Sequence, residues 1–352
     1  MKFLNTTLQQ NVKLVAFVSL RNFFDQKTKI KSDFPDAVVL PMFPGVKRWR
    51  KNIFLLRLLC KFKRPTTIIG RSVLATQLAV MIKNSGTIRN VVYDGRGAIT
   101  AEWKEYGVIN DPDMLREISE LETEAVLLSD VRIAVSNKLV EYWRSEFNYT
   151  GDEHVVIPCT LNKVFTEVVI SNEAVARSRE KLGLMPDDVV FVYSGSVAGW
   201  QSFDLLYTFI APMLRNGSNR ILFLADKDKN IEKLSKEFPG KVICKKVSAK
   251  EVPQYLLAGD YGLLIREKSV TNKVASPVKF AEYLSCGLQV IISDELGDYS
   301  EFVAKNSCGS VHSGFVTAVK IGLDKKLENQ KLAYKNFTKE TFVEEYRRIT
   351  NC

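Results

Sequence analysis

The chain has 352 residues, of which 46% are hydrophobic and 26% are charged, and its formal net charge is +10. These fractions are those of an ordinary globular protein, so they exclude disordered and fibrous chains. The length exceeds one compact core and predicts either two domains of about 150 residues each or one large α/β domain.

Apolar segments alternate with helical patterns through the first half of the chain. Strands are expected at residues 12–20, 36–42, 66–72, 90–96, 131–136 and 154–158, with helical patterns at 73–84, 112–127 and 137–147. Strands that alternate with helices indicate parallel sheets with covered faces. Only the stretch 1–11 precedes the first clear strand, so either the usual opening strand is absent or the N-terminal domain is reduced.

Positive charge is concentrated in the N-terminal quarter. Residues 1–90 hold 17 Lys and Arg but 3 Asp and Glu, a net charge of +14, while the remaining residues hold 33 and 37, a net charge of −4. We therefore expect this quarter of the chain to face an anionic partner.

Residues 45–65, GVKRWRKNIFLLRLLCKFKRP, form the densest basic stretch and interleave Lys and Arg with aromatic and leucine residues. A basic helix with one aromatic and leucine-rich face is typical of a segment that lies on an anionic membrane surface. Two alternatives stay open. One is a helix packed on the core with a basic outer face, and the other is a nucleic-acid contact, although no nucleic-acid motif is recognisable.

The alternation begins again near residue 160. Strands are expected at residues 189–195, 220–225, 242–247, 261–266 and 289–293, with helices at 172–183, 201–214, 229–238, 250–258, 277–286 and onward to the end. The simplest interpretation is two open α/β sheets in tandem. Ligands bind such sheets beyond the carboxyl ends of the strands, so a cleft between the two domains is the expected site.

The six cysteines lie far apart, with no CxxC pair and no cysteine-histidine cluster. This spacing favours a reducing compartment over a disulfide framework or a zinc site. Cys159, Cys244 and Cys286 adjoin apolar runs and are expected to be small core residues. No signal peptide is recognised and no apolar run approaches the roughly 18 residues that span a bilayer, so we expect a cytoplasmic protein.

Residues 276–293, SPVKFAEYLSCGLQVIIS, combine a helix start with a following strand. Ser276 is expected to be the N-cap and Pro277 the first helical residue. The free N–H groups and the positive end of the helix dipole favour a phosphate, and Lys279 adds a positive charge there. Glu282 lies one turn into the helix, where a carboxylate can accept hydrogen bonds from vicinal hydroxyls such as those of ribose. The alternative is an ordinary capped helix with an exposed lysine and glutamate.

A second phosphate candidate lies in residues 189–200, VVFVYSGSVAGW, where an apolar strand runs directly into Gly195 and Ser196. Glycine lets the backbone approach a ligand, and the next helix offers a second N-terminus. The string matches neither GxGxxG nor a P-loop. The two helix starts together are expected to hold the two phosphates of a nucleotide.

Residues 265–293, IREKSVTNKVASPVKFAEYLSCGLQVIIS, resemble the donor-site signature of retaining glycosyltransferases of the GT-B fold, family 4, with its phrase EYLxxGLPVI. Further matching segments extend the resemblance over most of residues 90–350. It implies two Rossmann-like domains with parallel sheets facing a central cleft. The implied parts are an acceptor-binding domain at 1–160, a nucleotide-sugar-binding domain at 161–335, and a helix at 336–352 that packs back on the first domain.

The resemblance also implies roles for single residues. Glu282 matches the glutamate that holds the nucleotide ribose, and Arg266 and Lys279 match the positive partners of the phosphates. Backbone amides near the helix start hold the diphosphate, and the residues before residue 250 receive the base. The donor-binding residues implied in this way are Gly195, Ser196, Lys246, Val247, Ser276, Pro277 and Glu282.

The chain departs from the family pattern at three places. Val274 stands where the family often has a second glutamate, so contacts with the donor sugar must come partly from elsewhere, such as the backbone around Ala275. Trp200 and Gln201 stand where a lysine commonly follows the glycine turn. Gln289 replaces the proline of GLPV.

The acceptor side is predicted from strand ends in the N-terminal domain. Asp94 is expected to accept a proton from the acceptor hydroxyl or to orient it, and Arg96 to bind acceptor or phosphate. Arg71 is a similar candidate at the end of the preceding strand. The alternative for Asp94 and Arg96 is a loop ion pair beside a turn glycine.

Neither histidine is placed as a general base, since His154 precedes a strand and His312 lies near the C-terminal end. Asp226, Lys227 and Asp228 form a DxD string like that of metal-dependent sugar transferases, but GT-B enzymes generally need no such site. The resemblance therefore implies no essential metal and no cofactor beyond the donor.

The implied activity is transfer of a hexose-type sugar from a nucleotide-diphosphate sugar to a saccharide or lipid-linked saccharide, with retention, in bacterial surface polysaccharide synthesis. The basic N-terminal segment adds the expectation of a peripheral contact at the inner face of the cell membrane. The alternatives are a sugar-nucleotide epimerase, a non-catalytic nucleotide-sugar-binding subunit, which Val274 favours, and a nucleic-acid-binding protein, which the acidic remainder of the chain disfavours.

Overall fold

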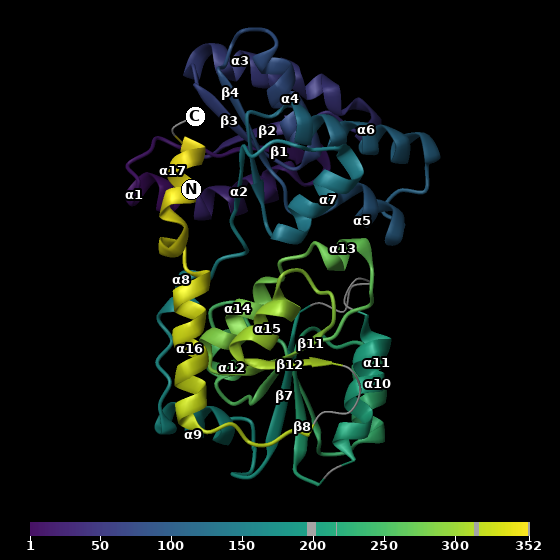
Figure 1. Ribbon diagram of the computed structural model, residues 1–352, viewed down its shortest axis with the longest axis vertical. Helices are drawn as coiled ribbons and strands as arrows, with labels where there is room; N and C mark the ends of the chain where they lie inside the picture. The colour runs from purple at the N-terminus through teal and green to yellow at the C-terminus, as the bar shows by residue number, and fades with distance from the viewer. Residues whose placement is uncertain (196–201, 216, 313–316, 351–352) are drawn as a thin grey trace. The chain divides into compact units, whose positions relative to one another are not determined.

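The computed structural model describes residues 1–195, 202–215, 217–312 and 317–350, and its internal contacts divide it into two compact units (Figure 1). The first unit contains Met1–Ala134, Val140–Ile157 and the described residues from Phe342 onward. The second unit contains Val135–Leu139 and the described residues of Pro158–Thr341. The first and the last described residues therefore both belong to the first unit.

The strands of the first unit pair in parallel and form two sheets. One sheet pairs β1 (Val15–Ser19) with β2 (Val38–Met42). The other has four strands in the order β3 (Thr67–Arg71), β4 (Asn90–Asp94), β5 (Val131–Ala134) and β6 (His154–Val156). Each strand lies within its predicted range, but the single sheet expected here is divided, because a strand pattern does not specify which neighbour the strand finds.

The helices of the first unit include α4 (Val73–Lys83) and α6 (Pro112–Leu128), both predicted from the sequence. The predicted helix α7 (Asn137–Phe147) begins in the second unit and belongs to the first from Val140 onward. Helices α2 (Phe23–Asp33) and α5 (Ile99–Glu105) were not predicted, and neither buries a residue. The remaining elements are α1 (Lys2–Thr6), η1 (Leu20–Asn22), η2 (Val46–Asn52), α3 (Ile53–Lys63) and α17 (Val343–Thr350). In α17, Ile349 joins a core cluster with residues of β4, β5 and β6.

The second unit is built on a six-stranded parallel sheet in the order β12-β11-β10-β7-β8-β9. Its strands are β7 (Val189–Ser194), β8 (Asn219–Leu224), β9 (Val242–Lys245), β10 (Tyr261–Leu264), β11 (Gln289–Ser293) and β12 (Gly309–His312). Strand β12 corrects the prediction of continuous helix after residue 293. It pairs so closely with β11 that a Cβ on Gly309 would lie 1.9 Å from the Val290 carbonyl oxygen.

Both faces of this sheet are covered, as expected for parallel strands (Figure 1). Val190, Val192 and Leu222 face one core with α12 (Val252–Leu256), α14 (Val278–Ser285), α15 (Tyr299–Asn306) and α16 (Leu323–Phe337). Phe191 and Phe223 face the other core with α10 (Phe203–Leu214) and α11 (Lys229–Glu237). The short elements are α8 (Lys163–Thr166), α9 (Asn172–Glu180), α13 (Val270–Lys273) and η4 (Glu340–Phe342).

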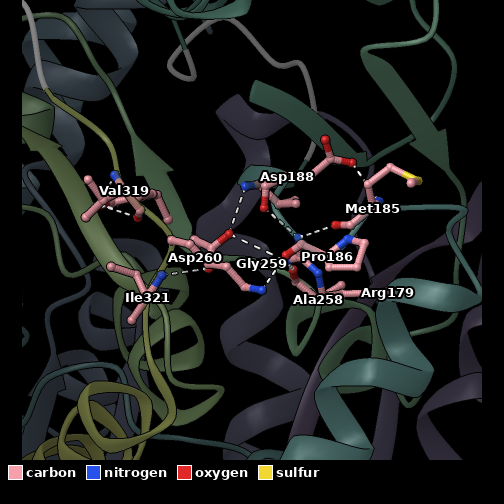
Figure 2. A network of polar contacts seen from close by, with 12 residues as sticks. Arg179, Met185, Pro186, Asp188, Ala258, Gly259, Asp260, Val319 and Ile321 are labelled. Carbon is pink, nitrogen blue, oxygen red and sulfur yellow. Dashed lines mark hydrogen bonds and ion pairs between the residues drawn. The ribbon is translucent and has the colours of Figure 1, made fainter. Parts of the chain in front are cut away.

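A buried polar network holds the amino ends of β7 and β10 (Figure 2). Asp260, fully buried, accepts the N–H groups of Val190 at 2.9 Å and Ile321 at 3.1 Å. Arg179 lies 3.5 Å from the same carboxylate and donates to the Ala258 and Met185 carbonyl oxygens, both at 3.0 Å. The amino ends of the central strands are thus closed by structural contacts, which leaves the carboxyl ends for a ligand.

Three cysteines were expected in the core, and only Cys286 is fully buried, while Cys159 and Cys244 are half-buried. Burial raises the pKa of the Cys286 thiol to about 12. Every helix in the described ranges is too short or too polar to cross a bilayer.

Candidate functional site

The order of the strands in the second unit places a switch point between β7 and β10. From β7 the chain adds β8 and β9 on one side, and from β10 it adds β11 and β12 on the other. Helices that follow neighbouring strands then leave the sheet toward opposite faces, which opens a crevice at the carboxyl ends. Gly195 directly follows β7, and Arg266 lies two residues after β10.

The start of α14 differs by one residue from the prediction. Pro277 is the N-cap, with φ −66° and ψ 116°, and Val278 is the first helical residue. Ser276 is therefore not the N-cap. Its hydroxyl instead accepts the Cys159 N–H at 2.9 Å and shares a 2.8 Å hydrogen bond with the Tyr299 hydroxyl. No side chain accepts a hydrogen bond from the leading N–H groups of α14 as a cap.

Lys279 and Glu282 form an ion pair on α14. The Lys279 Nζ donates to the Glu282 Oε2 at 2.7 Å, one turn along the helix. Glu282 is only 7% exposed, so the alternative of an exposed glutamate does not describe it. A buried carboxylate is normally retained with a partner, and Lys279 supplies that partner here. No other described residue binds this carboxylate, so Oε1 has no protein donor.

Tyr283 connects α14 to the end of β7. Its hydroxyl accepts the N–H of Ser194, the last residue of β7, at 2.9 Å. The Tyr283 ring is 1% exposed and lies on β10, where a Cβ on Gly262 would come within 2.3 Å of the ring. Burial raises the pKa of the Tyr283 hydroxyl, which keeps it neutral and in place. One side chain near the end of α14 therefore links this helix to the end of β7, next to Gly195.

Arg266, which follows β10, is held by hydrogen bonds from both its backbone N–H and its side chain. Its N–H donates to the Ser293 Oγ at 2.8 Å, and its Nη1 lies 3.4 Å from the Asn272 Oδ1. Its charge opposes the rise that burial causes in the pKa of both the Tyr193 and Tyr283 hydroxyls. The next residue, Glu267, donates its N–H to Ser202 at 3.0 Å, which ties the start of α10 to the end of β10.

Arg266 also borders a cavity of about 480 Å³ in the second unit. Leu205, Phe209, Pro212 and Met213 of α10 form an apolar wall, and residues that follow β10 and β11, with His312 at the end of β12, form the other. The His312 ring meets the Phe209 ring edge-on at 4.8 Å. Of the predicted site residues that the structure describes, Arg266 alone lines this cavity.

Lys246 and Val247 lie at the same end of the sheet but follow the edge strand β9, on the far side of β8 from β7. Lys246 is exposed and pairs with Asp226 at 2.6 Å. Asp228 caps α11 by accepting the Asn230 N–H at 2.8 Å. Both acids of the DxD string therefore have structural partners. Ser196 lies outside the described residues.

In the first unit, Arg71 and Asp94 end adjacent parallel strands and stand opposite each other in the register. Arg71 is exposed, and the Arg96 Nη1 lies 3.5 Å from the Asp94 Oδ1, so the ion pair left open as an alternative is present. Gly95 between them permits close packing, since a Cβ there would lie 2.6 Å from the Trp143 ring. A role for these residues in acceptor binding stays a prediction.

The loop that carries Arg96 is held by a residue that the sequence did not indicate. Glu122 of α6 is fully buried and accepts the N–H groups of Ile99 at 2.9 Å and Thr100 at 2.8 Å, at the start of α5. Burial raises the pKa of Glu122, and these two hydrogen bonds oppose the rise. Tyr283, Tyr299 and Glu122 were all missed as supporting residues. Only Tyr283 had a sequence signal, because it lies inside the EYL phrase.

Neither a protein-family model nor a curated protein sequence matches this chain. Solved structures do match. A glycosyltransferase from Rickettsia africae ESF-5 has a TM-score of 0.67 and 13% identity, over 97% of this chain and 100% of that chain. HepE of Anabaena, solved with UDP, has a TM-score of 0.66 and 14% identity, over 94% of this chain and 90% of that chain.

Sucrose-phosphate synthase of Thermosynechococcus elongatus is similar with a TM-score of 0.65 and 13% identity, over 90% of this chain and 83% of that chain. Matches over nearly the full length of both chains, at such low identity, establish the fold. The predicted α/β fold with parallel sheets is confirmed, and the chain has the fold of the GT-B glycosyltransferases.

Proposed function

We propose that this protein is a glycosyltransferase that moves a sugar from a nucleoside-diphosphate sugar to an acceptor hydroxyl. The observation that carries the proposal is the arrangement at the switch point of the second unit. Direct contacts there hold together the elements that carry four features. These are the start of α14, which no side chain caps, Gly195 after β7, Arg266 and the buried Glu282. A diphosphate needs N–H donors and positive charge, and a ribose needs a carboxylate acceptor.

The proposed roles follow from this geometry. The diphosphate lies at the N–H groups that follow Pro277, with the Arg266 guanidinium beside it. The ribose hydroxyls donate to Glu282 Oε1, since Lys279 already binds Oε2. When the bond from the sugar to the diphosphate breaks, negative charge develops on the departing phosphate oxygen. The helix start, Arg266 and Lys279 stabilise that charge electrostatically.

The finer assignments extend the same proposal. The donor is proposed to carry a hexose-type sugar and to react with retention, as the family-4 resemblance implies. UDP is the first nucleotide to test, since HepE of Anabaena was solved with UDP and also with UDP and glucose. The acceptor is proposed to be a saccharide or lipid-linked saccharide of surface polysaccharide synthesis in the cytoplasm, with Asp94, Arg96 and Arg71 on the acceptor side.

The test is binding of UDP, GDP, ADP, CMP and their sugar conjugates, measured as thermal shifts. At a concentration 100 times its Kd, a ligand stabilises the folded state by about 2.7 kcal/mol. The matching nucleotide should therefore raise the Tm of the second unit by about 5–10 °C. If none of these nucleotides stabilises the protein, the donor site is wrongly placed.

The site itself is tested with Glu282→Gln, which keeps the shape of the side chain and removes its charge. A hydrogen bond to a charged group contributes about 1.5–3 kcal/mol, so nucleotide affinity should fall about 10- to 150-fold. The matched control is Glu328→Gln in the same unit, since Glu328 also pairs with a lysine one turn away at 2.7 Å. Unchanged binding by Glu282→Gln would contradict the assignment.

A non-catalytic binding protein is the second candidate, because Val274 occupies the position of the family's other glutamate and is 2% exposed. Such a protein would bind the matching donor without transferring the sugar to any acceptor. An epimerase would instead convert the donor when no acceptor is present. Product analysis with and without acceptor separates both from the proposed transferase.

A further inference from the structure

Helix α3 of the first unit has two apolar faces rather than the single one that its sequence predicts. Ile53, Leu56 and Cys60 are buried and form the inner face, and Trp49 just before the helix is 4% exposed. Phe54, Leu58 and Phe62 point away from this core, with exposed fractions of 71%, 54% and 78%. Their spacing of four residues aligns them along one side of the helix.

The basic residues near this helix also fall into two groups. Lys47 pairs with Asp111 at 2.6 Å, and Arg50 pairs with Glu117, so these two charges are used inside the first unit. Arg57 and Lys61 lie on exposed positions of α3 between the three apolar side chains, and Lys63 and Arg64 follow at its end. Within the described ranges, none of these last four residues forms an ion pair.

An occupant of this face must accept both apolar side chains and positive charge. No Asp or Glu occurs in residues 45–65, so an anionic partner meets no repulsion there. A second copy of the chain that presents the same face would bring two sets of basic residues together, which is unfavourable. An anionic bilayer matches both features, because its headgroups attract Lys and Arg and its acyl boundary takes Phe and Leu.

We propose that the α3 stripe, defined as Phe54, Leu58 and Phe62 with Arg57 and Lys61, binds the surface of an anionic lipid bilayer. The helix lies in the plane of the interface, the three apolar side chains enter the acyl boundary, and the two basic residues contact lipid phosphates. Trp49, Lys47 and Arg50 hold the helix on the unit and stay outside the contact. This proposal is independent of the proposed sugar transfer, and either can fail without the other.

The test is sedimentation of the full-length protein with vesicles of phosphatidylcholine, with and without phosphatidylglycerol. The wild-type protein should bind the anionic vesicles, and binding should weaken as salt is added. The variant Phe54→Ser/Leu58→Ser/Phe62→Ser should lose at least about a hundredfold in vesicle affinity, since each large apolar side chain contributes about tenfold. The matched control is Val169→Ser/Met185→Ser/Val319→Ser, three residues of the second unit that are similarly exposed, and it should bind like wild type.

The charges are tested separately with Arg57→Glu/Lys61→Glu. Each basic residue near an anionic surface contributes about fivefold, so affinity at low salt should fall at least about twentyfold. The control is Lys331→Glu/Lys335→Glu, an exposed pair with the same spacing on α16 of the second unit, and it should bind as wild type does.

Four results would overturn the proposal. One is equal binding of neutral and anionic vesicles, and another is full vesicle binding by the triple serine variant of α3. The third is a wild-type dimer that the same variant converts to a monomer, because that result would assign the stripe to a second copy. The fourth is a wild-type protein that binds a single-stranded RNA probe but no vesicles, with RNA binding lost in the triple serine variant, because that result would assign the stripe to nucleic acid. Circular dichroism of each variant confirms that the fold is retained.

Discussion

The contact between Gly262 and Tyr283 gives a direct test of how the candidate site is held. Gly262 lies in the middle of the sheet, beside Val192 of β7 and Val290 of β11. In a Gly262→Ala variant, the new Cβ would lie 2.3 Å from two atoms of the Tyr283 ring and 2.8 Å from a third. Real Cβ atoms do not come so close, so the ring must move away from the strand.

The expected cost has two parts. Forcing a methyl group into a packed core costs about 1–3 kcal/mol. Displacing the ring also breaks the 2.9 Å hydrogen bond from Ser194 and leaves a buried N–H without a partner, which costs about 1–3 kcal/mol more. The free energy of unfolding should fall by about 2–6 kcal/mol, and the Tm by at least about 4 °C. Nucleotide affinity should fall as well, because Ser194 precedes the glycine turn.

Thermal and urea unfolding measure this prediction, with Gly217→Ala as the matched control. A Cβ on Gly217 would meet no atom within 4 Å, so the control should change the free energy of unfolding by less than about 0.5 kcal/mol. Tyr283→Phe isolates the hydrogen-bond part at about 1–3 kcal/mol. In a Tyr283→Ala background, Gly262→Ala should cost less than about 1 kcal/mol, because the ring is gone. If Gly262→Ala alone matches its control, the ring does not lie on β10 as described.

Three further predictions concern buried polar groups. Lys326 is 3% exposed, donates to the Gly259 carbonyl oxygen, and has a pKa lowered chiefly by burial. Folding therefore disfavours its charged form. The free energy of unfolding of wild type, measured by urea titration relative to Lys326→Met, should rise as pH increases toward the unfolded pKa of 10.5. A difference that stays constant with pH would contradict this. Burial raises the pKa of Glu122 above 4.5, so wild type should lose stability relative to Glu122→Gln as pH rises from 4.5 through that raised pKa, and a gain over the same range would refute it. Tyr299→Phe removes a 2.8 Å hydrogen bond to Ser276. The variant should bind the nucleotide about three- to tenfold more weakly, with little change in Tm. Binding equal to wild type would show that Ser276 does not need this hydrogen bond.

The sequence predicted the regular elements of both units well, and the reason is visible in the second. Alternate residues of β7 and β8 enter two different cores, so these strands are continuous apolar runs that stand out between polar helices. The elements it missed lack such a signal. Helices α2 and α5 bury no residue, and β12 is four residues long with no fully buried side chain.

The faces of α3 show the same limit. The sequence contains its apolar and basic residues, but not which of them meet the core. Only packing in the first unit assigns Ile53, Leu56 and Cys60 to the inside and leaves Phe54, Leu58 and Phe62 in water. A helix with apolar residues on more than one side has no unique inner face until its neighbours are in place.

The chain by itself determined most strands and helices, and the excess of positive charge in the first quarter. It also placed Gly195 after a strand, Pro277 at a helix start and Glu282 inside that helix. These features depend on residues close together in sequence, whose patterns can be seen directly. Only the tertiary structure decided that Tyr283 bonds Ser194 across 89 residues and that Ser276 bonds Cys159 across 117. Such contacts form because sheet order and packing bring distant segments together, and no local pattern encodes them.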